Sequence, residues 1–295
     1  RCGIAQALVI PLLVLLNMAQ WLAPFFTYHF YTGDPGDSIA RAVAMSVGAF
    51  LAATALGFAL AWAGRWLLAG RLRPGSYPLW GWVYWRWWLA DRLLEVVPVY
   101  MITGSPLQRA WLRGLGARIG PEVVLGSTTM RVPHLVTIGA GTSIGNGVNL
   151  ENARVEGGRL HLGRIDIGAN ACIGSYVVIE GDTAIGEWGH VEGQSALAAG
   201  QRVPAREVWH GSPARARGPF DPATLAPRPP VSARRHACEL AVFVLGALAV
   251  AVLFFMPVFP TFMAIDWLDV PQISVRPLVD EGDIGALQAF GLRLL

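Results

Sequence analysis

The residues best suited to chemistry in this chain lie in one short polar segment, "ENARVEGG". Glu151 and Glu156 supply carboxylates there, and Asn152 supplies an amide. Carboxylates form strong charge-assisted hydrogen bonds with cations, so the three residues are predicted to bind a substrate that carries an amine. The same carboxylates could instead pair with Arg154 or Arg159 and stabilise the segment itself.

Histidine is the other side chain that can transfer protons near neutral pH. His161 lies in the same polar stretch as the carboxylates, and His190 precedes an inward apolar position and is expected to face outward. These two histidines are the candidates for a catalytic base. A solvated or locally hydrogen-bonded histidine is the competing interpretation for both, as it is for His134 and His210.

Neither a metal site nor a phosphate-binding loop is predicted. The three cysteines, Cys2, Cys172 and Cys238, are far apart, and the sequence has no CxxC pair and no GxxxxGK[ST] motif. The formal net charge is only +3, so nucleic acid is not an expected partner. The composition, 54% hydrophobic and 15% charged, indicates a membrane protein instead.

The elements that must position these residues repeat with a period of six. Aliphatic residues recur without a break at Ile167, Ile173, Ile179, Ile185, Val191, Leu197 and Val203. The same period appears earlier at Ile119 and Leu125, and at Val132, Ile138, Ile144 and Leu150. Hexapeptide periodicity is typical of parallel β-helices, in which one aliphatic residue per side of each coil points inward. The sequence therefore predicts a left-handed parallel β-helix, with glycine after the aliphatic residue helping the chain to turn each corner.

Two irregular segments interrupt this period. The register shifts by one within residues 126–135, and residues 151–166 form an excursion between Leu150 and Ile167. Excursions from a repeat usually lie on one face, which is often the binding face. The polar cluster is therefore expected on such a face.

Three apolar segments are each long enough to cross a bilayer as a helix, at residues 4–26, 42–64 and 240–257. Arginine is frequent after the second segment and before the third, whereas the loop after the first has none. The positive-inside rule then places residues 65–239 in the cytoplasm. The expected location is the bacterial inner membrane, with the β-helix on the cytoplasmic side and the lipid bilayer as a partner.

A tryptophan-rich segment, "PLWGWVYWRWWLADRLLEVVPVY", follows the second apolar segment. Tryptophan favours the membrane interface, and the charged residues of the segment argue against a spanning helix. An interfacial helix and an ordinary helix docked on the β-helix are the two interpretations.

The fold class is thus membrane α-helical plus all-β, with the β-helix inserted between transmembrane helices 2 and 3. The predicted organisation is two transmembrane helices, tryptophan-rich and connecting helices, the β-helix, a linker, a third transmembrane helix and an acidic extracytoplasmic segment, at residues 1–70, 75–116, 117–217, 218–239, 240–260 and 261–295. The chain is expected to be a piece of a longer polypeptide.

The repeat and the closing "VWHGSPAR" resemble the hexapeptide-repeat acyltransferase superfamily. With the flanking "YWRWWLADRL", "GSPLQRAWLRGLGARIG" and "NLENARVEGGRLHLGRIDIG", nearly the whole chain is similar to the C-terminal membrane region of Pls/PosA-type, poly-lysine synthetase-like non-ribosomal peptide synthetases. That resemblance implies adenylation and carrier domains upstream, and a second hexapeptide and membrane unit or a homo-oligomer as partner. It also implies a phosphopantetheine thioester or an acyl-CoA as donor, with no cofactor bound by this segment.

In the superfamily, a histidine of an Asn-His pair is the usual general base. The matching position here is Asn152-Ala153, where alanine replaces the histidine. Three functions follow from the resemblance. The chain is part of an acyl- or aminoacyl-transferase that joins a carrier-bound aminoacyl thioester to an amine. Alternatively, it is a non-catalytic scaffold that packs on a second hexapeptide domain, or a stand-alone membrane-anchored acetyltransferase that uses acetyl-CoA.

Overall fold

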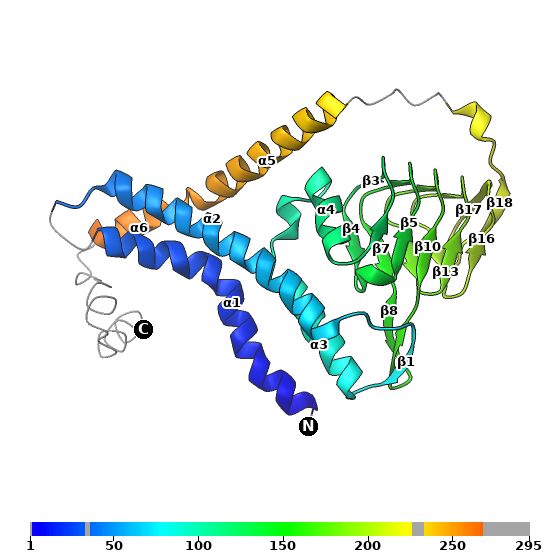
Figure 1. The fold of residues 1–295 in the computed structure, drawn as a ribbon, viewed down its shortest axis with the longest axis horizontal. Helices are drawn as coiled ribbons and strands as arrows, with labels where there is room; N and C mark the ends of the chain where they lie inside the picture. The colour runs from blue at the N-terminus through cyan, green and yellow to red at the C-terminus, as the bar shows by residue number, and fades with distance from the viewer. Residues whose placement is uncertain (1, 33–35, 226–232, 268–295) are drawn as a thin grey trace. The chain divides into compact units, whose positions relative to one another are not determined.

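A computed structural model describes residues 2–32, 36–225 and 233–267 of the chain (Figure 1). Most of the predicted acidic segment, residues 268–295 of 261–295, therefore lies outside the described residues. The chain divides into two compact units. One comprises residues 1–7, 62–95 and 99–246, and the other comprises residues 8–61, 96–98 and 247–295.

Long apolar helices form most of the second unit. They are most of α1 (Cys2–Tyr31) and α2 (Ile39–Gly64), the end of α5 (Ala233–Phe255), whose residues up to Gly246 belong to the first unit, and the shorter α6 (Val258–Trp267). Trp21 of α1 lies with its ring centroid 6.1 Å from that of Phe50 in α2, and Tyr28 of α1 lies 6.1 Å from Phe259 of α6. Three helical segments, Cys2–Tyr31, Ile39–Ala69 and Ala237–Thr261, are long and apolar enough to cross a membrane. The predicted membrane helices are confirmed in this sense.

Short elements connect the membrane helices to the β-helix within the first unit. Helix α2 continues as a π-helical turn, η1 (Arg65–Ala69), which is followed by strand β1 (Gly75–Pro78) and helix α3 (Trp82–Glu95). A 3-10 turn, η2 (Val99–Met101), and helix α4 (Pro106–Gly114) come next. Helix α4 begins where the Ser105 hydroxyl accepts a hydrogen bond from the Leu107 amide at 3.2 Å, which caps its first turn.

The β-helix consists of short strands that pass in rotation through three sheets. Its strands are β2 (Arg118–Ile119), β3 (Val124–Leu125), β4 (Thr128–Met130), β5 (Val136–Ile138), β6 (Ser143–Ile144), β7 (Val148–Glu151), β10 (Ile165–Ile167), β11 (Cys172–Ile173), β12 (Val178–Glu180), β13 (Thr183–Ile185), β14 (His190–Val191), β15 (Ala196–Leu197), β16 (Arg202–Val203) and β17 (Glu207–His210). Their sheet orders are β16-β13-β10-β5-β2, β17-β14-β11-β6-β3 and β15-β12-β7-β4, all paired in parallel. Strand β18 (Arg215–Pro219) closes the second sheet antiparallel to β17.

The period of six fills the interior of this β-helix. Ile138 lies beside Ile119 and Ile167, and Ile173 lies beside Ile144 and Val191, so identical positions stack from coil to coil. All are buried in one continuous cluster. The prediction for Val132 is wrong. Met130 pairs with Leu150 in the stack, and Val132 is buried in a separate cluster with residues of the connecting segment. The register shift at residues 126–135 moves it there.

The glycines that follow the inward aliphatic residues serve a different purpose from the predicted one. Gly168 and its equivalents do not have positive φ, so they are not the corner residues. A Cβ atom on Gly168 would lie 2.7 Å from Glu187 N and 2.7 Å from Gly186 C of the next coil. These glycines are needed because neighbouring coils approach each other too closely for a side chain.

Corners instead use a residue with positive φ that recurs with the same period. This conformation is adopted at Asn170, Tyr176, Asp182, Trp188, Gln194, Gly200 and Arg206. Most of these residues are not glycine, although the left-handed conformation costs an L-residue about 1–2 kcal/mol. Hydrogen bonds from corner amides to the neighbouring coil accompany the turn, such as Tyr176 N to Asn146 O at 2.8 Å.

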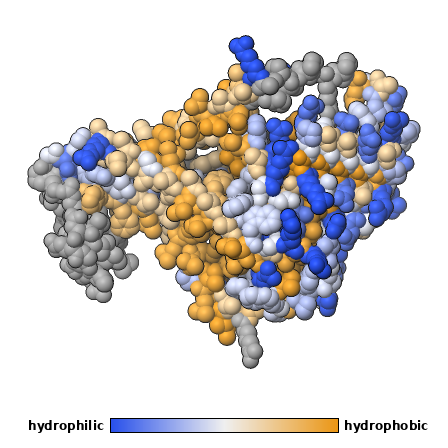
Figure 2. All heavy atoms as spheres, viewed as in Figure 1, coloured by the Kyte–Doolittle hydropathy of each residue, from blue (hydrophilic) through white to orange (hydrophobic). Residues whose placement is uncertain are grey.

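Figure 2 shows that hydrophobic residues gather over the helices, whereas hydrophilic residues gather over the β-helix. The exposed apolar residues of α1 include Leu8 at 75% and Leu12 at 64% exposure. Such a surface is unfavourable in water and is expected for helices that contact lipid.

Candidate functional site

The excursion at residues 151–166 is a β-hairpin made of β8 (Ala153–Glu156) and β9 (Arg159–Leu162). Strand β1 adds to its other edge, giving an antiparallel sheet in the order β1-β9-β8. Arg159 also donates from Nε to Ser76 Oγ at 2.6 Å. The hairpin therefore attaches the β-helix to the connection from α2, so the edge of β9 is covered by the chain itself.

The two predicted carboxylates lie at the ends of different strands, Glu151 at the end of β7 and Glu156 at the end of β8. Glu151 accepts a hydrogen bond from Asn149 Nδ2 at 2.8 Å. Glu156, with its side chain 64% exposed, forms an ion pair with Arg154 at 2.8 Å, and Arg154 also contacts Glu180 at 3.0 Å. The predicted alternative, in which the carboxylates pair with Arg154, is therefore observed for Glu156.

Asn152 is buried, with 1% of its surface exposed. Its Oδ1 accepts from Val132 N at 3.0 Å, and its Nδ2 donates to Val132 O at 2.7 Å. The Asn152 side chain thus makes the hydrogen bonds to Val132 that the backbone of a neighbouring strand would otherwise make, at the point where the chain leaves the coil. Both ends of this side chain are engaged by the protein itself, which is typical of a structural amide.

The two candidate histidines lie on different sheets and are not brought together. His161 lies in β9, opposite Ser76 of β1 and Arg154 of β8. His190 lies in β14, and its ring centroid is 5.5 Å from that of Phe220. His210 Nδ1 lies 3.0 Å from Glu192 Oε2.

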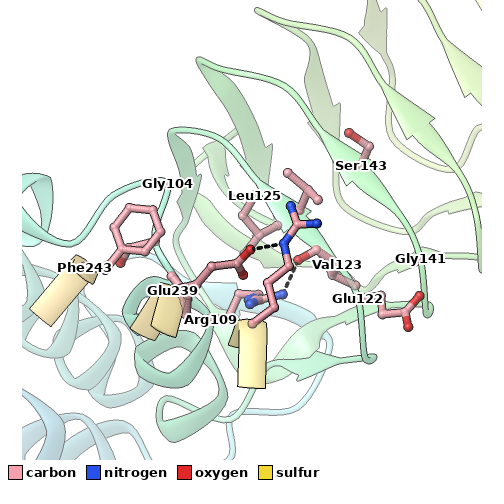
Figure 3. A pocket seen from close by; sticks show the side chains of 13 residues that line it. Gly104, Arg109, Glu122, Val123, Leu125, Gly141, Ser143, Glu239 and Phe243 are labelled. Carbon is pink, nitrogen blue, oxygen red and sulfur yellow. Dashed lines mark hydrogen bonds and ion pairs between the residues drawn. The ribbon is translucent and has the colours of Figure 1, made fainter. Parts of the chain in front are cut away.

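A cavity of about 500 Å³ lies on another part of the first unit (Figure 3). Its lining includes Arg109, Glu122, Ser143, Glu239 and Phe243, and none of the five predicted site residues. Arg109 Nη1 donates to the Val123 carbonyl at 2.7 Å. No group of three or more histidine, cysteine, aspartate or glutamate side chains that could hold a metal occurs in the part of the chain that the structure describes.

The structure also contains a buried arginine–histidine pair that the sequence does not predict. Arg65, at the end of the second membrane-length helix, is 2% exposed and donates from Nη1 to Gly70 O at 2.8 Å. Its Nη2 donates to His134 Nδ1, and His134 Nε2 donates to Leu72 O at 2.7 Å. Because Nε2 carries the proton, the imidazole is neutral and Nδ1 is the acceptor. The only sequence signal was a lone arginine at the end of an apolar run.

The stability of the chain is expected to fall as the pH drops from about 7 to 5, partly through His134. Burial lowers the pKa of His134, and Arg65 and Arg71 lower it further, against the opposing hydrogen bond to Leu72 O. The unfolded chain then binds a proton near the ordinary histidine pKa, whereas the folded chain does not. Unfolding midpoints measured across this range should depend less on pH in His134→Gln. An unchanged pH dependence would contradict this role for His134.

No protein-family model matches the chain. The chain is 44% identical, over 277 residues, to delta-poly-L-ornithine synthetase of Acinetobacter baumannii, and the match covers 94% of this chain. The chain is similar to a segment of a poly-ornithine synthetase. The resemblance predicted from the membrane and repeat motifs is therefore confirmed. The chain spans only 21% of the length of this relative.

Solved structures with some similarity include acetyltransferases. An acetyltransferase from Vibrio cholerae is 15% identical with a TM-score of 0.34, and the match covers 57% of this chain and 93% of that one. A maltose O-acetyltransferase from Clostridium difficile is 13% identical with a TM-score of 0.34, covering 57% and 88% of the two chains. At this level of similarity, the activity and ligands of those enzymes are not transferred to this chain.

Proposed function

We propose that the chain is a membrane-embedded aminoacyl-transfer region of a poly-amino-acid synthetase. It joins a carrier-bound aminoacyl thioester to a free amine. The observation that carries this proposal is the 44% identity to a poly-ornithine synthetase over 94% of the chain. The match covers nearly the whole chain, and the chain includes both the β-helix and three membrane-length helices.

In this reaction the amine nitrogen attacks the thioester carbonyl, the carbon–sulfur bond breaks, and the thiol leaves. A base accepts the proton that the amine loses. We propose His161 or His190 as that base, and Glu151 and Glu156 as contacts for the cationic side chain of the substrate. Asn152 holds the hairpin in place, because its amide is occupied by Val132.

The donor in this proposal is a phosphopantetheine thioester on a carrier domain, with an acyl-CoA as the other possible donor. Upstream adenylation and carrier domains, together with a second hexapeptide unit or further copies of the chain, are the proposed partners. We place the chain in the bacterial inner membrane with a left-handed β-helix in the cytoplasm. The distribution of arginine around the apolar segments and the period of six support these assignments.

A scaffold function is the second candidate, and one observation favours it. Ala153 occupies the position where hexapeptide acyltransferases carry a histidine, and it is buried in the cluster that joins the hairpin to β1 and α3. No imidazole can act from this position. In the scaffold case a second hexapeptide domain supplies the base.

The two candidates are separated by a transfer assay on the purified chain in lipid nanodiscs. The donor is ornithinyl-pantetheine, the acceptor is free ornithine, and the product is measured as ornithine dipeptide by mass spectrometry. We expect dipeptide to form faster than in empty nanodiscs, and His161→Gln or His190→Gln to abolish the difference. Acetyl-CoA as donor tests the stand-alone acetyltransferase. A rate equal to that of empty nanodiscs with both donors would refute catalysis by this chain.

A further inference from the structure

Helix α3 has two faces with different surroundings. Trp87, Leu89 and Ala90 are buried, with exposures of 9%, 7% and 3%. Trp87 and Ala90 pack in a cluster with Ala69 of η1 and Leu160 of β9. By this face α3 is a docking helix, which is one of the two interpretations drawn from the sequence.

Two tryptophans, at the start of α3 and just before it, are exposed instead. Trp80 is 59% exposed and Trp82 is 68% exposed. The Trp82 and Trp85 rings are stacked with centroids 5.0 Å apart, and Trp80 meets Tyr84 edge-on at 5.7 Å. We call these four residues the aromatic patch. Its outer rings are large, pre-arranged and uncovered within the described chain, which is costly in water.

The neighbourhood of the patch indicates what covers it. Helix α3 packs on η1, which continues the helix Ile39–Ala69 that is apolar and long enough to cross a membrane. Arg86 of α3 fixes this contact, because its Nη2 lies 3.4 Å from Ala69 O. The exposed Arg71 and Arg73 follow η1 directly and can pair with lipid phosphates. Tryptophan with adjacent arginine is the pattern of a membrane–water interface.

We propose that the aromatic patch inserts into the lipid interface beside the second membrane helix. The patch directly follows strand β1, and β1 pairs with β9 of the excursion hairpin. Lipid contact at Trp80 and Trp82 therefore holds the hairpin, and with it the edge of the β-helix, at a constant height above the bilayer. This inference does not depend on the proposed function.

Spin labels with collision reagents test the proposal. The three cysteines are replaced by serine, and single cysteines are introduced as Trp82→Cys and Trp80→Cys for nitroxide labelling. Leu12→Cys, on an exposed position of α1, is the lipid reference, and Asp166→Cys, on an exposed position of β10, is the aqueous reference. Each protein is placed in phosphatidylcholine nanodiscs with and without phosphatidylglycerol. Circular dichroism verifies folding first.

Oxygen concentrates in lipid and a nickel chelate stays in water, so the ratio of their collision rates reports the environment. We expect the ratio at Trp80 and Trp82 to exceed that at Asp166 several-fold and to approach that at Leu12. A ratio equal to that at Asp166 would overturn the proposal. Protection from both reagents would also overturn it, since that result indicates a protein partner over the patch. Either position suffices if one variant does not fold.

Discussion

Gly168→Ala is expected to lower the free energy of unfolding by about 3 kcal/mol or more. The new Cβ would lie 2.7 Å from two backbone atoms of the next coil, and a backbone cannot move aside as a flexible side chain can. Two coils must separate, and the aliphatic stack on both sides of Ile167 and Ile185 loses contact. For a chain of this size the melting temperature should fall by roughly 6–12 °C. Thermal unfolding of the chain in detergent, followed by circular dichroism, measures this melting temperature.

Gly200→Ala is the matched control, because Gly200 has a φ of +80° and a Cβ there would have no neighbour within 4 Å. Its cost is that of the left-handed conformation alone, about 1 kcal/mol, and Gly200→Asn should be nearly neutral. If Gly168→Ala cost no more than Gly200→Ala, close coil contact would not be the reason for glycine at position 168.

Asn152→Ala is expected to destabilise the chain by about 2–4 kcal/mol. The substitution leaves the buried N–H of Val132 without its partner and opens a small cavity at the base of the hairpin. The Val132 carbonyl loses one of two hydrogen bonds and keeps the one from Leu135 N. Because Val132 packs beneath α3 and β9, loss of the amide should loosen the hairpin and strand β1 together. Hydrogen exchange of the β1 and β9 amides, read by mass spectrometry, reports this loosening.

Asn149→Ala, in the preceding strand β7, is a control of the same residue type. Its amide donates to Glu151 in a half-buried position, so its loss should cost less than about 1 kcal/mol. Equal stability of the Asn152→Ala and Asn149→Ala proteins would contradict the structural role. A loss of transfer activity in Asn152→Ala without any loss of stability would instead indicate that Asn152 contacts substrate.

The β-helix could be predicted from the sequence because its geometry repeats. Every coil requires an aliphatic residue at the same inward positions, so Ile167, Ile173 and Ile179 can be identified as core residues from their spacing alone. The reason for the glycines could not be obtained in the same way. Turning a corner and allowing close approach of coils both select glycine, and only coordinates separate them.

The candidate site depended on contacts that spacing does not encode. The hairpin pairs with β1, more than seventy residues earlier in the chain, and neither strand carries a local signal for the other. The pairing of Arg65 with His134 is similarly distant. Val132 matches the period of six and still lies outside the aliphatic stack. The spacing between Leu125 and Met130 is one residue shorter, so Met130 takes the inward position and Val132 packs in the other cluster.

The sheet β1-β9-β8 also determines where this protein can be divided. A fragment limited to residues 117–217 has the hexapeptide repeat in full, yet it lacks the strand that pairs with β9. Its β9 edge would present free N–H and C=O groups, and such edges recruit strands from other molecules. The natural boundary of the repeat domain is therefore not the first hexapeptide but Gly75, where β1 begins.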